Sequence, residues 1–371
     1  MKKALILGIG SAQVDAIQYL KKHGWWVIGC SYRKEGPGLD LIDHFELINI
    51  TDVNSIQQLV NKEGIDLVYS VGSDLAMPSV AEISDRLGLP SFVRPGTAKL
   101  LQSKTELRGF LSKNNISPVN YRVIKDATDI QGWDFYPAML KPTDSQGQRG
   151  ISRVESYEDI TNNLDSALNA SRTGIAILEE VLEGPEVSVN AFVVDGQVVL
   201  SEVSDRWVLS GYPGGIPQAH ILPTQKATNI LIKETKNLVK QCIHALDIKN
   251  GPVYFQIILT SQGPRIVEIT PRLDGCHMWR LIKEVTGYDL LDASFRLLTG
   301  KPIKPFVGYE EFSVSSLVFL YQAPNTEFLK NNHHLPSDVL YKEYYFQEGQ
   351  RVPAINGQME KVGYYIKRGL P

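Results

Sequence analysis

The sequence predicts a mixed fold, with an N-terminal α/β unit built on a parallel sheet and a following α+β unit built on antiparallel sheets. Over the first hundred residues, short apolar runs such as 4–10 and 65–71 alternate with amphipathic helical segments such as 11–24. From about residue 118 onward, the pattern changes to pairs of strand signals joined by tight turns. At 371 residues the chain exceeds one ordinary core, so two or three domains are expected.

Composition and charge exclude several classes of protein. A hydrophobic content of 43% and a charged content of 21% are typical of a soluble globular protein. The net charge of −3 argues against a dedicated nucleic-acid binder. No apolar stretch approaches the roughly 20 residues that span a bilayer, so no membrane partner is expected. Cys30, Cys242 and Cys276 form no disulfide framework or CxxC site, which favours the reducing cytoplasm.

Two stretches fall short of familiar nucleotide-binding motifs. Gly8 and Gly10 follow the first strand as in a dinucleotide fingerprint, but Gln13 stands in place of the third glycine. The second strand, ending in "GCSYR", also lacks the acidic residue that would hold a ribose. We therefore prefer a tight turn at the sheet edge. "SKT" resembles the end of a P-loop, but Ser103 and Ala98 replace the required glycines.

The stretch "AMLKPTDSQGQRGISRV", residues 138–154, is a candidate phosphate site. An apolar run ends at Lys141, and a loop containing Gly147 and Gly150 follows it. Backbone N–H groups of such a loop can approach phosphate oxygens where bulky side chains would obstruct them. The alternative is an ordinary surface lysine at a strand end.

Residues 251–275 form a predicted hairpin with polar side chains on one face. If its turn is centred near Gln262, then Gln256 lies opposite Glu268 and Thr270 lies opposite Tyr254. Directly opposed side chains have Cβ atoms roughly 5 Å apart, close enough to share a hard cation. A solvated sheet face is the alternative. The irregular "PRLDGCH" that follows favours a functional site over it.

Four pieces of the chain, in this order, resemble the ATP-grasp superfamily, which includes carbamoyl-phosphate synthetase, biotin carboxylase and many carboxylate–amine ligases. The pieces are Lys104 in "SKTELR", Lys141 in "LKPTDSQGQRG", the segment "LEEVLEGPEVSV", and the pair Gln256 and Glu268 with "IVEITPR". The resemblance covers about residues 3–300, including the Rossmann-like domain that commonly precedes the grasp domain.

The resemblance implies a nucleotide site. Lys104 and Lys141 would contact the ATP phosphates, and the loop from Asp144 to Gly150 would fold over the triphosphate. The further cofactor-binding residues that it implies are Ser145, Gly147 and Gly150 in the loop, backbone groups around Glu179, Glu180 and Leu182 for adenine, and Glu186 for ribose. An acidic surface turn is the alternative for the glutamates of this hinge.

The resemblance also implies a metal site and catalytic groups. Gln256, Glu268 and Thr270 would ligate Mg²⁺, for which Mn²⁺ is a possible substitute. Thr270 stands where the carbamoyl-phosphate synthetase branch has asparagine, and its hydroxyl has a shorter reach. Arg272 would meet a developing acyl phosphate, with Lys141 and Glu268 as the other catalytic groups.

The expected activity is that of an ATP- and Mg²⁺-dependent, ADP-forming carbon–nitrogen ligase. It would activate a carboxylate as an acyl phosphate and transfer it to an amine. The partners would be these small molecules, with a homodimer as an open alternative. Carboxyphosphate or carbamoyl-phosphate chemistry, and a non-catalytic ATP-binding regulator, are the competing interpretations, and a nicotinamide oxidoreductase ranks below them.

Domain limits follow from the same patterns. We expect a Rossmann-like domain at 1–95, an ATP-grasp domain at 96–305 with a lid at about 118–185, and a β-rich C-terminal subdomain at 306–371. Three residues keep open roles. His220 can border the acceptor site or belong to a structural loop, Asp74 can contact substrate or cap a helix, and His277 can cap a helix, touch substrate or pack.

Overall fold

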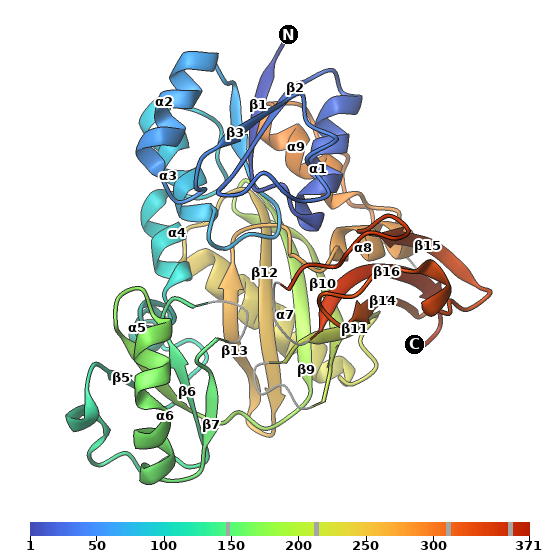
Figure 1. Cartoon of the computed structure of the whole chain (residues 1–371). Coiled ribbons are helices and arrows are strands. Elements are labelled where there is room, and N and C mark those ends of the chain that lie inside the picture. Colours follow the sequence, from blue (N-terminus) through green and yellow to red (C-terminus); the bar gives the residue numbers. More distant parts are fainter. Residues whose placement is uncertain (146–148, 211–214, 309–312, 355–358) are drawn as a thin grey trace.

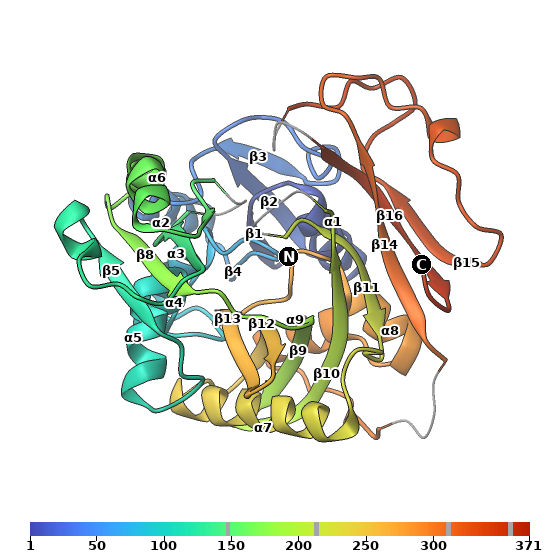
Figure 2. The same cartoon turned by 90° about the horizontal axis from the view of Figure 1, so that it is seen from below.

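The computed structural model describes residues 1–145, 149–210, 215–308, 313–354 and 359–371, within which the strands form three sheets (Figure 1). A four-stranded parallel sheet is N-terminal, an eight-stranded antiparallel sheet is central, and a four-stranded antiparallel sheet stands to one side (Figure 2). The predicted mixture of a parallel sheet followed by antiparallel sheets is confirmed. No described helix is long and apolar enough to cross a bilayer.

The N-terminal sheet is buried on both faces. Its strand order is β3-β2-β1-β4, and all its pairings are parallel. Ala4 and Ile6 of β1 face one apolar core, and Leu5 and Leu7 face another, as expected for a parallel sheet covered by helices. The elements are β1 (Lys3–Leu7), α1 (Ser11–Lys22), β2 (Trp26–Ser31), β3 (His44–Leu47), α2 (Val53–Glu63), β4 (Leu67–Tyr69) and α3 (Met77–Leu87).

Gln13 closes the glycine-bearing turn after β1. Its Oε1 accepts a hydrogen bond from the Gly10 N–H at 2.9 Å, and its Nε2 donates to the Val71 carbonyl. A Cβ on Gly8 would lie 3.3 Å from the Gln13 side chain, so this side chain already fills the space beside the turn. The turn is therefore held by internal hydrogen bonds, as the tight-turn interpretation expects.

Residues 95–113 form two helices, α4 (Pro95–Gln102) and α5 (Lys104–Lys113). Pro95 takes the first position of α4, where its fixed φ favours a helix start. Ser103 is extended, and its side chain accepts from the Glu106 N–H at 3.3 Å. This cap separates the two helices and makes Lys104 the first residue of α5.

The lateral sheet has the strand order β5-β8-β6-β7 and a small core of its own against α6. Its elements are β5 (Tyr121–Ile124), the 3₁₀ helix η1 (Ala127–Ile130), β6 (Ala138–Pro142), β7 (Ser152–Val154), α6 (Tyr157–Ala170) and β8 (Ala176–Glu180). These strands fall inside the expected lid at 118–185, while the domain limits themselves stay a prediction.

The central sheet has the order β13-β12-β9-β10-β11-β14-β16-β15. Its elements are β9 (Glu186–Val194), β10 (Gln197–Val208), β11 (Pro217–Leu222), α7 (Asn229–Ala245), β12 (Gly251–Thr260), β13 (Gly263–Thr270), β14 (Ser315–Gln322), η2 (Lys330–Asn332), β15 (Val339–Tyr344) and β16 (Glu360–Arg368). β9 and β10 form a hairpin with its turn at Asp195-Gly196, and both residues have positive φ, as this two-residue turn requires.

The C-terminal strands continue the central sheet, because β14 pairs with β11. They share a core with the N-terminal sheet through α8 (Met278–Thr286) and α9 (Leu290–Leu298). Ile6, Phe295, Phe319 and Tyr364 all belong to this core. Figure 1 shows the N-terminal sheet at one end of β9, β10 and β12, with the C-terminal strands to one side.

Candidate active site

The central sheet has an apolar face and a polar face, because side chains alternate along each strand. Val187 and Val189 of β9 and Phe255 and Ile257 of β12 are fully buried in the core that includes α7 (Figure 2). The intervening positions carry polar groups. Those that bear on the site are Glu186, Ser188, Arg206, Gln256, Glu268 and Thr270.

The predicted register of β12 and β13 is confirmed: Gln256 pairs with Glu268, and Tyr254 pairs with Thr270. The turn itself differs from the prediction, since Thr260 pairs with Gly263 and the centre lies half a residue earlier than Gln262. The pairing shifts between Gln256 and Ile257 of β12, where β13 carries one extra residue, and this shift brings Gln256 opposite Glu268. A β-bulge of this kind changes the direction of the side chains beyond it.

Glu268 fits the role of a metal ligand. Burial raises the pKa of its carboxyl, and the nearby Asp74 charge raises it further, while Lys104 and Arg272 oppose the shift. No donor among the described residues is bonded to this carboxylate. The Thr270 hydroxyl is also buried, without a hydrogen-bond partner in the described chain. A desolvated carboxylate and an unpaired hydroxyl on one sheet face suit a hard cation.

Gln256 offers one further oxygen to the candidate metal site formed by Glu268 and Thr270. Its Nε2 donates to Glu186, which leaves its amide oxygen as an acceptor. No group of three His, Cys, Asp or Glu side chains in the described chain is placed to hold a metal. A cation here would depend on amide and hydroxyl oxygens beside Glu268, and the metal site stays a prediction.

Lys141 lies on the lateral sheet and pairs with Glu179 of the adjacent strand. Its Nζ is 2.7 Å from Glu179 Oε2, and Arg108 Nε is 2.5 Å from Glu179 Oε1. Met139 is the direct partner of Glu179, so Lys141 is its diagonal neighbour on the same face. Despite complete burial, the two cations hold the pKa of Glu179 at about 2. The side chain of Glu179 therefore orients Lys141, whereas the prediction used only backbone groups of this segment.

Lys104 approaches the same region from the start of α5. Its Nζ donates to the Ser145 carbonyl at 2.9 Å, and its N–H donates to the Thr143 carbonyl at 2.9 Å. Burial lowers the pKa of Lys104, and the Lys141 charge also lowers it, while Glu268 and Glu179 raise it. The structure thus brings both predicted phosphate lysines and Glu268 into one electrostatic neighbourhood.

The loop after β6 is held at its start by hydrogen bonds to the Asp144 side chain. Asp144 Oδ1 accepts from Ser171 Oγ at 2.8 Å and from the Arg172 N–H at 3.0 Å. Gly147 lies outside the described residues. Gly150 has φ of +72°, and an added Cβ would lie 2.7 Å from Ala170 Cβ. Packing against α6 therefore requires glycine at 150 independently of any ligand.

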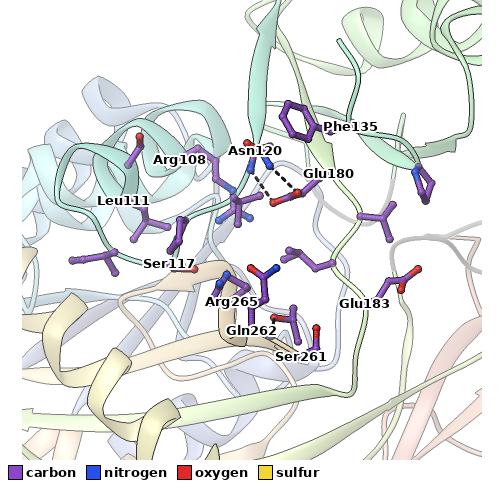
Figure 3. A pocket seen from close by; sticks show the side chains of 18 of the residues that line it. Arg108, Leu111, Ser117, Asn120, Phe135, Glu180, Glu183, Ser261, Gln262 and Arg265 are labelled. Carbon is purple, nitrogen blue, oxygen red and sulfur yellow. Dashed lines mark hydrogen bonds between the residues drawn. The ribbon is translucent and has the colours of Figure 1, made fainter.

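The hinge after β8 has backbone N–H groups both with and without partners among the described residues. The N–H of Glu180 donates to the Asn120 carbonyl, and that of Val181 donates to the Pro137 carbonyl, both at 3.0 Å. The Glu180 carboxylate accepts from the backbone and side chain of Asn120, each at 2.9 Å (Figure 3). The N–H groups of Leu182, Glu183 and Gly184 are bonded to no described residue, so hinge donors remain for a base edge.

Glu186 lies at the start of β9 and is held by two side chains. Arg206 donates to its Oε1 at 2.6 Å, and Gln256 donates to the same oxygen. Burial raises the pKa of Glu186, and the Arg206 guanidinium opposes that rise. Arg206 also donates to the Gly215 carbonyl at 2.7 Å. The second carboxylate oxygen of Glu186 is left as an acceptor for hydroxyl groups.

Arg272, just beyond β13, pairs with Asp74 of the N-terminal domain. Its Nε lies 2.6 Å and its second terminal nitrogen 2.5 Å from Asp74 Oδ1. Its remaining terminal nitrogen donates to the Leu273 carbonyl at 3.0 Å. The helix-cap alternative for Asp74 is wrong, because α3 begins after Ala76 without a side-chain cap. The structure is consistent with the other alternative, which puts Asp74 at the substrate site.

The two histidines of open role are both buried. His220 lies within β11, opposite Arg206, and neither ring nitrogen has a hydrogen-bond partner in the described chain. Burial lowers its pKa well below 6.5, so the ring is neutral. His277 precedes α8 without capping it; its ring stacks on Tyr364, and its Nε2 is 2.8 Å from Tyr345 Oη. His277 therefore packs between the C-terminal strands and α8.

A cavity of about 730 Å³ borders the hinge (Figure 3). It is bounded by α5, the segment 180–183 and the turn between β12 and β13. Arg108 and Arg265 line it, whereas neither phosphate lysine nor Glu268 does. This cavity is therefore separate from the polar face of the central sheet.

Comparison with known proteins agrees with this arrangement. Residues 134–279 match the ATP-grasp domain family. The chain is 27% identical over 187 residues to the formate-dependent phosphoribosylglycinamide formyltransferase of Prochlorococcus marinus, an alignment that covers 49% of this chain and 48% of that enzyme. It is 24% identical over 363 residues to the phosphoribosylamine–glycine ligase of Methanococcus vannielii, covering 87% of this chain and 78% of that ligase.

Among solved structures, the biotin carboxylase domain of the Hydrogenobacter thermophilus 2-oxoglutarate carboxylase, crystallised as a dimer with MgADP and bicarbonate, superposes with a TM-score of 0.80. The superposition covers 99% of this chain and 86% of that one at 15% identity, which establishes a shared fold. The match over residues 134–279 shows an ATP-grasp domain, so the predicted resemblance to the ATP-grasp superfamily is confirmed.

Three charged residues at this site were missed or only weakly indicated by the sequence. Arg206 follows Glu202 and Ser204 at alternate positions of β10, and this period-two polar pattern could have placed it on the polar face. Arg108 gives no such signal, because its partner Glu179 is 71 residues away. Lys361 of β16 lies 4.0 Å from Cys276 and over the Phe319 ring, so the C-terminal strands also reach this region.

Proposed function

We propose that this protein is an ATP- and Mg²⁺-dependent ligase that activates a carboxylate as an acyl phosphate, releases ADP and transfers the acyl group to an amine. The observation that carries the proposal is the convergence of Lys104, Lys141, Glu268 and Arg272 at the junction of three structural units. Relatives named as ligases of phosphoribosylamine and glycine support the same class.

The phosphate-binding part of the proposal uses the lateral sheet and α5. Lys104 and Lys141 supply compact positive charges for a triphosphate. The Leu182 N–H supports adenine recognition, and the free oxygen of Glu186 supports ribose recognition. These contacts would align the terminal phosphate with the polar face that carries Glu268.

The metal-binding part uses Gln256, Glu268 and Thr270. A bound Mg²⁺ would neutralise the negative charge that develops on the phosphate oxygens during transfer. Glu268 would hold it with full negative charge, because cation binding offsets the effect of burial on its pKa. Thr270 offers a hydroxyl oxygen on a short side chain, and the Gln256 amide carbonyl offers a second neutral ligand.

The acyl-transfer part uses Arg272 and the N-terminal domain. A carboxylate oxygen of the acid substrate attacks the γ-phosphorus, and the bond from that phosphorus to the bridging oxygen of ADP breaks. An amine then adds to the acyl carbon, loses a proton and expels inorganic phosphate. Arg272 donates to the developing oxygen charge, and Asp74 fixes the orientation of its guanidinium. No protein nucleophile is required.

Three finer features belong to this proposal. Mn²⁺ replaces Mg²⁺ at the same oxygen ligands, since both are hard cations that octahedral oxygen sites accept. The protein acts in the cytoplasm, which its three free cysteines support. A second copy of the chain is proposed as its partner, and a dimer among the structurally similar proteins supports this.

Product analysis tests the proposal. Purified protein is incubated with ATP, Mg²⁺ and pools of amino acids and small carboxylates, beside the Lys141→Ala and Glu268→Ala variants. The expected result is pool-dependent ADP and phosphate that both variants lose. AMP and pyrophosphate as products would overturn the mechanism, and absence of ATP binding would overturn the nucleotide site itself.

A further inference from the structure

We propose that Arg108 is the permanent counter-ion of Glu179, and that this pairing leaves the positive charge of Lys141 available to an ATP phosphate. The inference rests on the proposed function, because it assumes that Lys141 contacts that phosphate. It adds a positioning residue that none of the sequence motifs contains.

The geometry gives each oxygen of Glu179 its own cation. Arg108 Nε lies 2.5 Å from Oε1, and Lys141 Nζ lies 2.7 Å from Oε2. The Arg108 and Glu179 side chains are 3% and 5% exposed, whereas the Lys141 side chain is 13% exposed. Lys141 is therefore the most exposed member of the triad, and Arg108 and Glu179 are almost fully buried.

Charge balance explains why a second cation is needed. An ammonium beside a single carboxylate forms a nearly neutral pair, and such a pair attracts a phosphate only weakly. With Arg108 present, the negative charge of Glu179 is already matched, and one positive charge remains for the nucleotide. In this buried setting water screens the charges poorly, so the remaining charge acts strongly on a nearby phosphate.

The environment of Arg108 is costly for a purely structural residue. One terminal nitrogen donates to the Ile266 carbonyl at 2.6 Å, but the other has no partner among the described residues. A buried N–H group without a partner lowers stability, and an apolar side chain could fill the same volume. The position of Arg108 is therefore better explained by its charge than by its contribution to packing.

Arg108 acts through Glu179 and does not touch the nucleotide itself. Its unpaired terminal nitrogen has no solvent-accessible surface, so no ligand atom reaches it. It projects from α5, the helix that also begins with Lys104. Both cations that bear on Lys141 thus come from one helix, and the position of α5 determines the charge that the phosphates meet.

The test compares the net charge of the triad with nucleotide affinity. Binding of MgADP is measured by calorimetry for the wild type, Arg108→Met, Glu179→Gln and the double variant. The triad holds one positive charge in the wild type and in the double variant, none in Arg108→Met and two in Glu179→Gln. We expect Arg108→Met to weaken binding at least about tenfold, the double variant to bind like the wild type, and Glu179→Gln to bind at least as tightly.

Two further variants separate charge from structure. Arg108→Lys keeps the charge and should retain most of the affinity. Arg265→Met, which removes another arginine beside the same cavity, should bind MgADP like the wild type. If Arg108→Met fails to fold, the double variant still decides the question, because it removes both members of the buried pair and leaves neither charge unmatched.

The outcomes distinguish this inference from the proposed function. Wild-type affinity in Arg108→Met, or equal losses in Arg108→Met and the double variant, would overturn the role of Arg108 while leaving the ligase intact. A wild-type protein that does not bind MgADP would instead overturn the proposed function and the inference together.

Discussion

Arg272 and Asp74, 198 residues apart in the chain, meet in an ion pair with Nε 2.6 Å from Oδ1. Arg272 follows β13, an edge strand of the central sheet, whereas Asp74 follows β4 of the parallel sheet. Carboxyl ends of parallel strands are where open α/β sheets bind ligands. The pair therefore joins the end of β13 to the carboxyl edge of the parallel sheet.

Asp74→Asn should reduce turnover more than nucleotide binding. The amide removes the charge that orients Arg272, and a misplaced catalytic donor costs about 10- to 100-fold in kcat. Steady-state kinetics with the identified substrates would show a lower kcat with little change in KM for ATP. Asp85→Asn, an exposed change on α3, is the control. An unchanged kcat in Asp74→Asn would contradict the positioning role.

Arg206→Met should make nucleotide binding dependent on pH. Burial already raises the pKa of Glu186, and Arg206 opposes that rise, so its removal raises the pKa further. A larger share of Glu186 is then protonated at a given pH, and the protonated carboxyl accepts hydroxyl donors poorly. We expect MgADP affinity to fall about tenfold at pH 7 and to recover as the pH is raised. Calorimetry from pH 6 to 9 checks this, and a loss that is constant with pH would refute it.

His220→Leu should reduce the loss of stability in mild acid. The folded-state pKa of His220 lies well below 6.5, so the unfolded chain binds more protons. The stability that this neutral ring contributes is present above pH 6.5 and is lost, at up to about 1.4 kcal/mol per pH unit, as the pH falls. Thermal unfolding at pH 7.5, 6.5 and 5.5 should show a shallower decline in the variant. The exposed His334→Leu should decline like the wild type.

Gly150→Ala should destabilise the lateral sheet more than Gly174→Ala. Both glycines have positive φ, +72° and +66°, so both substitutions carry backbone strain of about 1 kcal/mol. At Gly150 the new Cβ would also lie 2.7 Å from Ala170 Cβ, while at Gly174 nothing lies within 4 Å. Limited proteolysis of residues 118–185 should be faster for the first variant. Equal rates would show that α6 moves aside without cost.

Several features follow from sequence alone, because they depend on neighbours in the chain. The Asp195-Gly196 turn is set by residues that tolerate positive φ, and the pairing of β12 with β13 follows from the short turn between them. The alternation of strands and helices likewise indicates the parallel sheet. The order of the quoted motifs was sufficient for the superfamily, which the comparisons confirm.

Other features exist only in the tertiary structure, because their partners are distant in sequence and obey no spacing rule. Arg108 meets Glu179 across 71 residues, and Arg272 meets Asp74 across 198. The register irregularity beside Gln256 depends on how two strands fit their neighbours in the sheet. Residue types and short-range periodicity thus determined which strands carry polar groups, whereas packing of separate units decided which charges lie side by side.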